Sequence, residues 1–192
     1  MAIAERIEAL PIPAPRRLTI QEFLDLPDDG FKHEWVDGEA VFVPTSWIHD
    51  KIMGRLYRWL YAHAGHMGEF ALGQAGCWMR SGNLRVPDLG FMLAENLPGG
   101  TAPKDFTERG PDFCMEVVSP SERRAGLESK RRDYMESGTR LLWFVDPERG
   151  TVTVHTPDAP PRVLSGEDVL DLDAVIPGFR CTVAALLGTE GE

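Results

Sequence analysis

Hydrophobic positions along the chain follow patterns that predict two buried strands with a helix between them. Residues 112–118 and 139–147 are almost continuously apolar, which is typical of strands that are buried on both faces. Residues 121–138 lie between them, are mostly polar and end at a glycine, which predicts a helix. Because a connecting helix allows two strands to run parallel, we predict an α/β fold of mixed α+β type, with a mixed central sheet flanked by helices.

Local signals predict the first elements of the chain. Thr19 and Glu22 form a capping-box pattern, so a short helix is expected to begin there. Asp37 and Gly38 make a favoured two-residue turn between alternating apolar residues. They predict an added N-terminal hairpin that carries Glu34 on its first strand.

An amphipathic helix is expected over residues 46–65, after the hairpin. Its apolar stripe should face the core, so its other faces should be solvated. Three basic residues recur on one of those other faces: Lys51, Arg55 and Arg58.

Length and composition predict one domain. The chain has 192 residues, of which 43% are hydrophobic, and this is enough for one substantial core. Residues 1–18 are rich in proline and are expected to form a flexible arm, and residues 19–188 are expected to form the domain. No segment resembles a signal peptide or approaches the roughly 20 apolar residues of a membrane span, so we expect a cytoplasmic protein without membrane contact.

The net charge restricts how this chain could bind nucleic acid. Its formal net charge is -10, whereas phosphate binding depends largely on Lys and Arg side chains. Any contact with nucleic acid must therefore use a local basic patch. The densest basic segment lies in the helix predicted over residues 121–138, and its expected phosphate contacts are Arg123, Arg124, Arg131 and Arg132.

Glu116 lies in the middle of a predicted buried strand, where a carboxylate needs a partner. An ionised carboxylate in such a strand costs several kcal/mol unless a cation, a metal or hydrogen bonds compensate it. Lys130 is the first candidate, because it shares one helix face with Leu127 and Tyr134. This face is the apolar one and should turn toward the sheet, which aims the lysine inward.

A metal ion is the second candidate partner of Glu116, and it would require other hard oxygen ligands nearby. Asp88 offers one, since it follows Pro87. Proline cannot donate to a strand ladder and belongs at the beginning, edge or bulge of a strand. Asp88 is therefore expected at a break in strand pairing, although turn chemistry alone could also account for it.

Several short segments occur in the order of one known family. They are HEWVDGE with Glu34, VPDLGFM with Asp88, PDFCMEVVSPS with Glu116, the downstream Lys130 and Tyr134, LLWFVDPERGTVTVH, and IPGF. Together these segments, which span Thr19 to Leu187, resemble the Uma2 family of restriction endonucleases, also called DUF820. The resemblance implies the PD-(D/E)XK nuclease fold, a mixed four-stranded core flanked by helices.

The resemblance also implies roles for individual residues. Asp88 and Glu116 correspond to ligands of magnesium, for which manganese can substitute, and Glu34 to an accessory acid. Val118 stands where the basic superfamily pattern places its lysine. In this family the following helix is thought to supply that lysine, and Lys130 matches its place.

Gly126 is a second departure, since relatives typically carry an aspartate there. Glycine weakens a helix interior by about 1 kcal/mol, so the sequence does not fix the residue at which this helix begins. Ser119, Pro120 and Glu122 could alternatively cap an earlier start.

These residues support the hypothesis of a magnesium-dependent endonuclease that acts on DNA. Hydrolysis of a phosphodiester needs a cation that offsets charge on the phosphate and activates water, and a lysine can stabilise the transition state. A homodimer would be plausible, because cutting two strands often uses two sites. The expected catalytic residues are Asp88, Glu116, Lys130 and Glu34, with Tyr134 as an accessory that donates to a phosphate or orients the lysine.

Other interpretations remain open at this point. Glu116 and Lys130 could form a purely structural pair, Glu34 could be an exposed hairpin residue, and Tyr134 could serve packing. The histidines show no metal-ligand spacing, and capping or surface roles are expected for them. The domain could instead be a non-catalytic module that binds nucleic acid or protein, which fits the net charge better, or a metal-dependent hydrolase of another phosphate ester.

Overall fold

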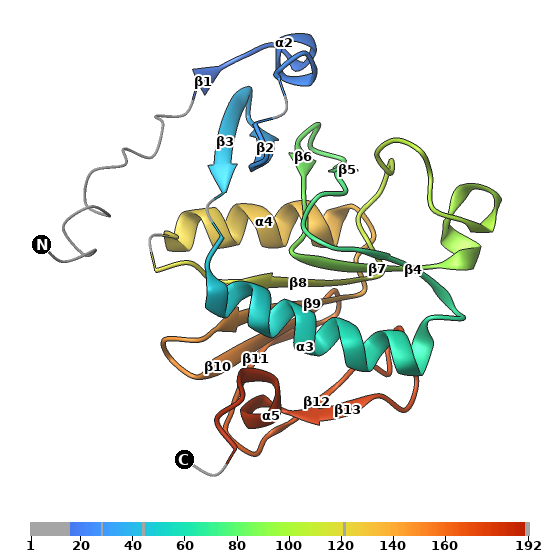
Figure 1. Ribbon diagram of the computed structural model, residues 1–192, viewed down its shortest axis with the longest axis vertical. Helices are drawn as coiled ribbons and strands as arrows, with labels where there is room; N and C mark the ends of the chain where they lie inside the picture. The colour runs from blue at the N-terminus through green and yellow to red at the C-terminus, as the bar shows by residue number, and fades with distance from the viewer. Residues whose placement is uncertain (1–15, 28, 44, 121, 191–192) are drawn as a thin grey trace, which may run out of the picture.

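The core of the fold is a six-stranded sheet, in the order β11-β10-β9-β8-β7-β4, with helices on both faces (Figure 1). The structure is a computed structural model that describes residues 16–27, 29–43, 45–120 and 122–190. The strands of this sheet are β4 (Gly68–Ala71), β7 (Leu89–Leu93), β8 (Phe113–Val117), β9 (Leu141–Asp146), β10 (Thr151–Thr156) and β11 (Ala159–Ser165).

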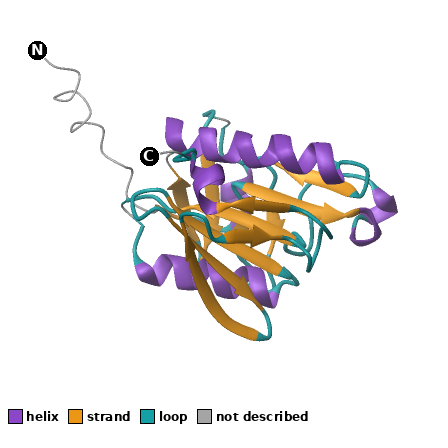
Figure 2. Cartoon of the chain, turned by 90° about the horizontal axis from the view of Figure 1, so that it is seen from below, coloured by secondary structure: helices purple, strands orange, loops and turns teal. Residues whose placement is uncertain are grey.

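Strands β8 and β9 run parallel, and the other neighbouring pairs of this sheet are antiparallel. Helix α4 (Arg124–Glu136) connects β8 to β9, as the apolar patterns of the sequence predict. The mixed sheet flanked by helices is therefore confirmed. Both strands are buried almost throughout, because each of their two faces is covered. Figure 2 shows the helical layers on opposite sides of the sheet.

Side chains that alternate along β8 divide the core into two parts. Phe113 and Met115 pack in a cluster with residues of α3 (Trp47–Ala64) and α5 (Val183–Leu187). Cys114 packs in another cluster with Tyr134 of α4. Because strand side chains alternate with a period of two, Glu116 lies on the side of α4.

A second, five-stranded sheet lies on the other side of α4 from the six-stranded sheet, in the order β1-β3-β2-β6-β5 (Figure 1). Its centre is the predicted hairpin, in which Asp37 and Gly38 adopt φ values of 51° and 82°. Both values lie in the left-handed region that a two-residue hairpin turn requires. The strands are β1 (Arg16–Arg17), β2 (Lys32–Val36), β3 (Glu39–Val43), β5 (Cys77–Trp78) and β6 (Leu84–Arg85).

The remaining described elements are short. The capping box of Thr19 and Glu22 is present at the start of α2 (Ile20–Leu24), as predicted. Two 3-10 turns follow β7, and the C-terminal part adds a two-stranded sheet: η1 (Ala94–Asn96), η2 (Pro98–Gly100), β12 (Val169–Asp171) and β13 (Arg180–Thr182). Within the described residues, no helix is both long enough and apolar enough to cross a membrane.

Two sequence expectations differ from the structure. The expected arm, residues 1–18, falls largely on residues 1–15, which lie outside the described part. Its next two residues, Arg16 and Arg17, pair with β3, so this part of the arm belongs to a sheet. The edge of the hairpin offers unpaired backbone groups that these two residues satisfy.

The structure also decides against an earlier start of α4, the alternative that the sequence leaves open. The helix begins at Arg124, with Gly126 in its first turn. The amide of Val118 donates to the carbonyl of Val145 at 2.8 Å and so extends the ladder of β8 and β9. A chain that is still extended at Val118 reaches its helical conformation only after the turn in which Glu122 N donates to Ser119 O.

Arg85 joins the hairpin sheet to α4. Its Nη1 donates to Glu34 Oε2 at 2.9 Å, and its Nε donates to Asp133 Oδ2 at 2.8 Å. Its Nη2 donates to Ser129 Oγ at 2.9 Å. The guanidinium therefore connects β6, β2 and α4 in a region that excludes most solvent.

We expect Arg85→Met to lower the free energy of unfolding by about 3–5 kcal/mol, because it leaves two buried carboxylates without their cation. Arg17→Met is the matched control, since Arg17 pairs with Glu39 at the surface and should contribute less than about 1 kcal/mol. Denaturant unfolding measures both changes. Equal, small losses for the two variants would contradict the proposed junction.

Candidate active site

Asp88 lies where the chain passes from one sheet to the other, between β6 and β7. Pro87 precedes it, and the break in pairing that the sequence predicts is present here. Leu89 lies opposite Met115 in the antiparallel pair of β7 and β8. Asp88 precedes Leu89 and Glu116 follows Met115, so the two acids are neighbours. Both carboxylates are buried, with exposed fractions of 2% and 1%.

Both oxygens of Asp88 have partners. Lys32 Nζ donates to Oδ1 at 2.6 Å. His49 Nε2 lies 2.7 Å from Oδ2, and the amide of Val117 donates to the same oxygen at 2.7 Å. Burial alone would raise the pKa of Asp88. The contacts with Lys32 and His49 lower it by more than burial raises it, so the pKa lies below its usual range. Asp88 is therefore held as a carboxylate.

Glu116 receives bonds from the inward face of α4. Lys130 Nζ donates to Oε2 at 3.1 Å, and Tyr134 Oη donates to Oε1 at 2.7 Å. Lys130 also lies 3.1 Å from Glu122 Oε1. Burial raises the pKa of Glu116, and Asp88 raises it further against the opposing effect of Lys130. The two neighbouring acids thus have pKa values that are shifted in opposite directions.

Glu34 is buried in the site and is not an exposed hairpin residue. Its Oε2 accepts from Arg85, and its Oε1 accepts from the amide of Val86 at 3.0 Å. Burial would raise the pKa of Glu34, but Lys130 and Arg85 lower it more, and the pKa is below its usual value. Glu34 thus holds the guanidinium of Arg85 beside the two acids.

The acids open onto one cavity of about 670 Å³. Its charged lining comes from both sheets, from α3 and α4, and from their flanks: Glu34, His49, Arg85, Asp88, Glu116, Glu122, Lys130 and Glu148. Much of the remaining wall is apolar, and Val41, Phe42 and Ile48 belong to it. A low-polarity wall strengthens the electrostatic interactions of the charges inside it.

Sequence reasoning missed two side chains that contact Asp88. Lys32 shares a strand face with Glu34, since the two residues are two positions apart on β2. The predicted capping or surface role of His49 is wrong, because its side chain is buried against Asp88. His49, Ile52 and Leu56 follow the spacing of one buried helix face, which was the available signal.

The predicted basic contacts are only partly free. Arg123, Arg124 and Arg132 are exposed along α4. Arg131 is engaged by Glu128, to which it donates at 2.9 Å and 2.5 Å. On α3, Arg55 is not part of a solvated face, because it donates to the carbonyl of Leu186 at 2.5 Å.

A hollow of about 830 Å³ continues from the acid-lined cavity along α4. Arg124 and Arg131 line it, and it shares Val118 and Pro120 with the cavity. The exposed cations at the start of α4 are therefore adjacent to the acids.

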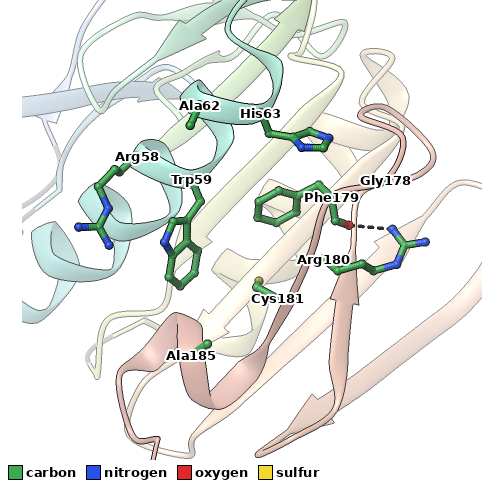
Figure 3. A pocket seen from close by; sticks show the side chains of 9 residues that line it. All are labelled: Arg58, Trp59, Ala62, His63, Gly178, Phe179, Arg180, Cys181 and Ala185. Atoms are coloured by element: carbon green, nitrogen blue, oxygen red, sulfur yellow. Dashed lines mark hydrogen bonds between the residues drawn. The ribbon is translucent and has the colours of Figure 1, made fainter.

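Figure 3 shows another hollow, of about 800 Å³, between α3 and β13. Its lining includes Trp59, His63 and Arg180 but no carboxylate. Arg180 is already paired with Asp173, and His63 Nε2 lies 3.0 Å from the carbonyl of Pro177. This hollow lacks the oxygen ligands of a magnesium site, so the acid-lined cavity is the candidate active site.

The donor set of the cavity fits a hard divalent cation. Magnesium is usually held by one or two carboxylates together with water and substrate phosphates, and Asp88 and Glu116 are two adjacent carboxylates. Across the described residues, however, no three acids, histidines or cysteines form a ready-made ligand group. Protein cations hold the carboxylate oxygens instead.

Comparisons with known proteins agree with this fold. A crystal structure described as "a putative nuclease belonging to DUF820 from Anabaena variabilis ATCC 29413" superposes with a TM-score of 0.79, covering 89% of this chain and 98% of that chain at 20% identity. No curated protein matches the sequence. A family model described as "Putative restriction endonuclease" matches residues 20–184. The chain therefore belongs to the Uma2 family.

Proposed function

We propose that this protein is a magnesium-dependent endonuclease that hydrolyses phosphodiester bonds in DNA, with manganese able to replace magnesium. The observation that carries the proposal is the adjacent burial of Asp88 and Glu116 beside Lys130 in one cavity. A carboxylate pair can hold the metal that assists phosphodiester hydrolysis, and a lysine beside it can stabilise the transition state. The family description and the nuclease name of the similar structure support the same reaction.

Asp88 and Glu116 would hold the metal. When bound, a divalent cation supplies charge that offsets the phosphate and lowers the pKa of water. Val117 and Tyr134 fix one oxygen each of the two acids through hydrogen bonds of 2.7 Å. These contacts fix the orientation of the carboxylates before any ligand arrives.

Lys130 is the proposed donor to the transition state. Burial would lower the pKa of its ammonium, but Glu116, Glu34 and Glu122 raise it well above its usual value. It is therefore charged and suits electrostatic stabilisation of a phosphate better than proton abstraction. Tyr134 orients Glu116, and Glu34 holds Arg85 in its accessory role.

DNA is the proposed substrate because the exposed arginines of α4 lie beside the cavity. Arg124 lines its continuation along the helix, and the exposed Arg123 precedes it, so a phosphate backbone could contact these two side chains. A homodimer would supply two such sites for two strands. We propose both features as parts of the nuclease function.

A second candidate is a non-catalytic binding module, which the pairing of charges favours. Each acid that faces the cavity centre has a cationic partner: Asp88 with Lys32, Glu116 with Lys130, and Glu34 with Arg85. Incubation with a panel of DNA, RNA and small phosphate esters, with and without magnesium, distinguishes the candidates. Metal-dependent cleavage of DNA supports the nuclease, cleavage of small esters alone supports another hydrolase, and binding without cleavage supports the module.

We expect magnesium or manganese to raise the melting temperature. A metal that binds only the folded state at 100 times its dissociation constant should stabilise it by about 2.7 kcal/mol. The variants Asp88→Asn and Glu116→Gln should show no such shift, because each removes a charged ligand. A wild-type protein whose melting temperature does not respond to tens of millimolar metal, roughly 100-fold above a submillimolar dissociation constant, would contradict the site.

We expect Lys130→Met to slow cleavage by about a hundredfold or more, as removal of a transition-state donor does. It should also cost about 3 kcal/mol of stability, because it leaves Glu116 without its buried cation. Lys104→Met, at an exposed position between η2 and β8, is the control, and it should change neither quantity much. Rates are compared at a temperature where all variants are folded. Cleavage by Lys130→Met at the wild-type rate would end the assignment.

We expect replacement of Arg123 and Arg124 by Ala to weaken DNA binding similarly for all sequences and to flatten its salt dependence. Replacement of Arg131 and Arg132 should act in the same direction but less strongly, since Arg131 is already paired with Glu128. Binding titrations at several salt concentrations measure both effects. Unchanged affinity and salt slope for both double variants would move the contact surface away from α4.

A further inference from the structure

Lys32 is buried against Asp88, one of the acids that line the cavity. Its side chain is 3% exposed and its Nζ is 2.6 Å from Asp88 Oδ1. Glu34, two positions along β2, projects from the same strand face. The hairpin thus inserts a cation among the carboxylates that face α4.

The ammonium of Lys32 lies in the field of three acids. Asp88 contacts it directly, Glu34 shares its strand face, and Glu116 is the neighbour of Asp88 on the adjacent strand. The point where three carboxylates stabilise an ammonium is also the point where they would most stabilise a metal cation. Lys32 therefore places its positive charge at Asp88, one of the two acids that would hold the metal.

An ammonium and a divalent cation cannot share this region at low cost. Asp88 Oδ2 is already used by His49 and the amide of Val117, so Oδ1 is the oxygen left for a metal. Lys32 holds that oxygen at hydrogen-bond distance. Like charges at such short range repel strongly, so an ammonium and a metal compete for this oxygen.

Lys32 is also the most displaceable of the three buried cations. Arg85 is fixed by three acceptors, and Lys130 lies against two glutamates. Within the described residues, Lys32 Nζ donates to Asp88 alone. The strand that carries it meets β6 at one register pair, Trp35 and Leu84.

We propose that Lys32 is an internal counter-ion that occupies the metal position at Asp88 and must withdraw before a divalent cation binds, so that Lys32 limits the metal affinity of the site. The inference rests on the proposed metal site and adds a residue that controls it. Lys32 is a positioning residue in this scheme, because it acts through Asp88. Without metal it keeps the buried carboxylate compensated.

The test is the affinity of the full chain for Mn²⁺, measured by electron paramagnetic resonance of free Mn²⁺ and by calorimetry, without any nucleic acid. We expect Lys32→Met to bind Mn²⁺ at least about tenfold more tightly than the wild type, a conservative value for removal of a like charge. Lys51→Met makes the same change in net charge at an exposed position of α3 and should leave the affinity unchanged. The double variant Lys32→Met with Asp88→Asn should lose the gain.

Lys32→Gln serves where the methionine variant fails to fold, because its amide can still donate to Asp88 while carrying no charge. It should also bind Mn²⁺ more tightly than the wild type. Lys32→Arg keeps the charge and should not. Equal or weaker binding by the neutral variants would overturn the inference.

The outcomes separate this inference from the nuclease proposal. Tighter Mn²⁺ binding by Lys32→Met in a protein that cleaves no DNA would support the inference and remove the nuclease proposal. Unchanged Mn²⁺ affinity in a protein that cleaves DNA would do the reverse. Failure of both the wild type and the neutral variants to bind Mn²⁺ would overturn the inference together with the metal site.

Discussion

Compensation of buried carboxylates by cations is the interaction on which the rest of this structure depends. A buried carboxylate without a partner costs several kcal/mol, so each acid in the cavity fixes where a basic side chain must lie. These pairs connect segments that are distant in the sequence, and they hold the hairpin sheet, α4 and the six-stranded sheet together. The pairs are Asp88 with Lys32, Glu116 with Lys130, and Glu34 and Asp133 with Arg85.

The topology brings these acids together through two features. The parallel pairing of β8 and β9 requires a crossover, and α4 supplies it on the face of β8 that carries Glu116. The chain also changes sheets at Pro87, which leaves Asp88 outside both ladders and next to Glu116. Neither acid could lie in the middle of a fully paired, apolar sheet without a cation that compensates its charge.

The same compensation links stability with the proposed chemistry. Cations that neutralise the acids stabilise the fold, but they also occupy the oxygens that a metal would need. The pKa of Asp88 is lowered and that of Glu116 is raised, because their immediate partners differ. The charge of each acid therefore depends on which cations contact it. In the proposed nuclease, phosphate oxygens of the substrate would add to the metal ligands that the two acids supply.

The sequence by itself determined several of the elements and part of the candidate site. The Asp37-Gly38 turn, the buried strands and the helix face of Lys130 follow from local spacing, and Pro87 marked the break at Asp88. Only the tertiary structure decided the partners of the acids. Lys32 and Asp88 are 56 positions apart, and no local pattern reports which cation reaches which carboxylate across that separation. Helix and strand periods specify which face is buried, whereas ion pairing between faces depends on how sheets and helices are packed.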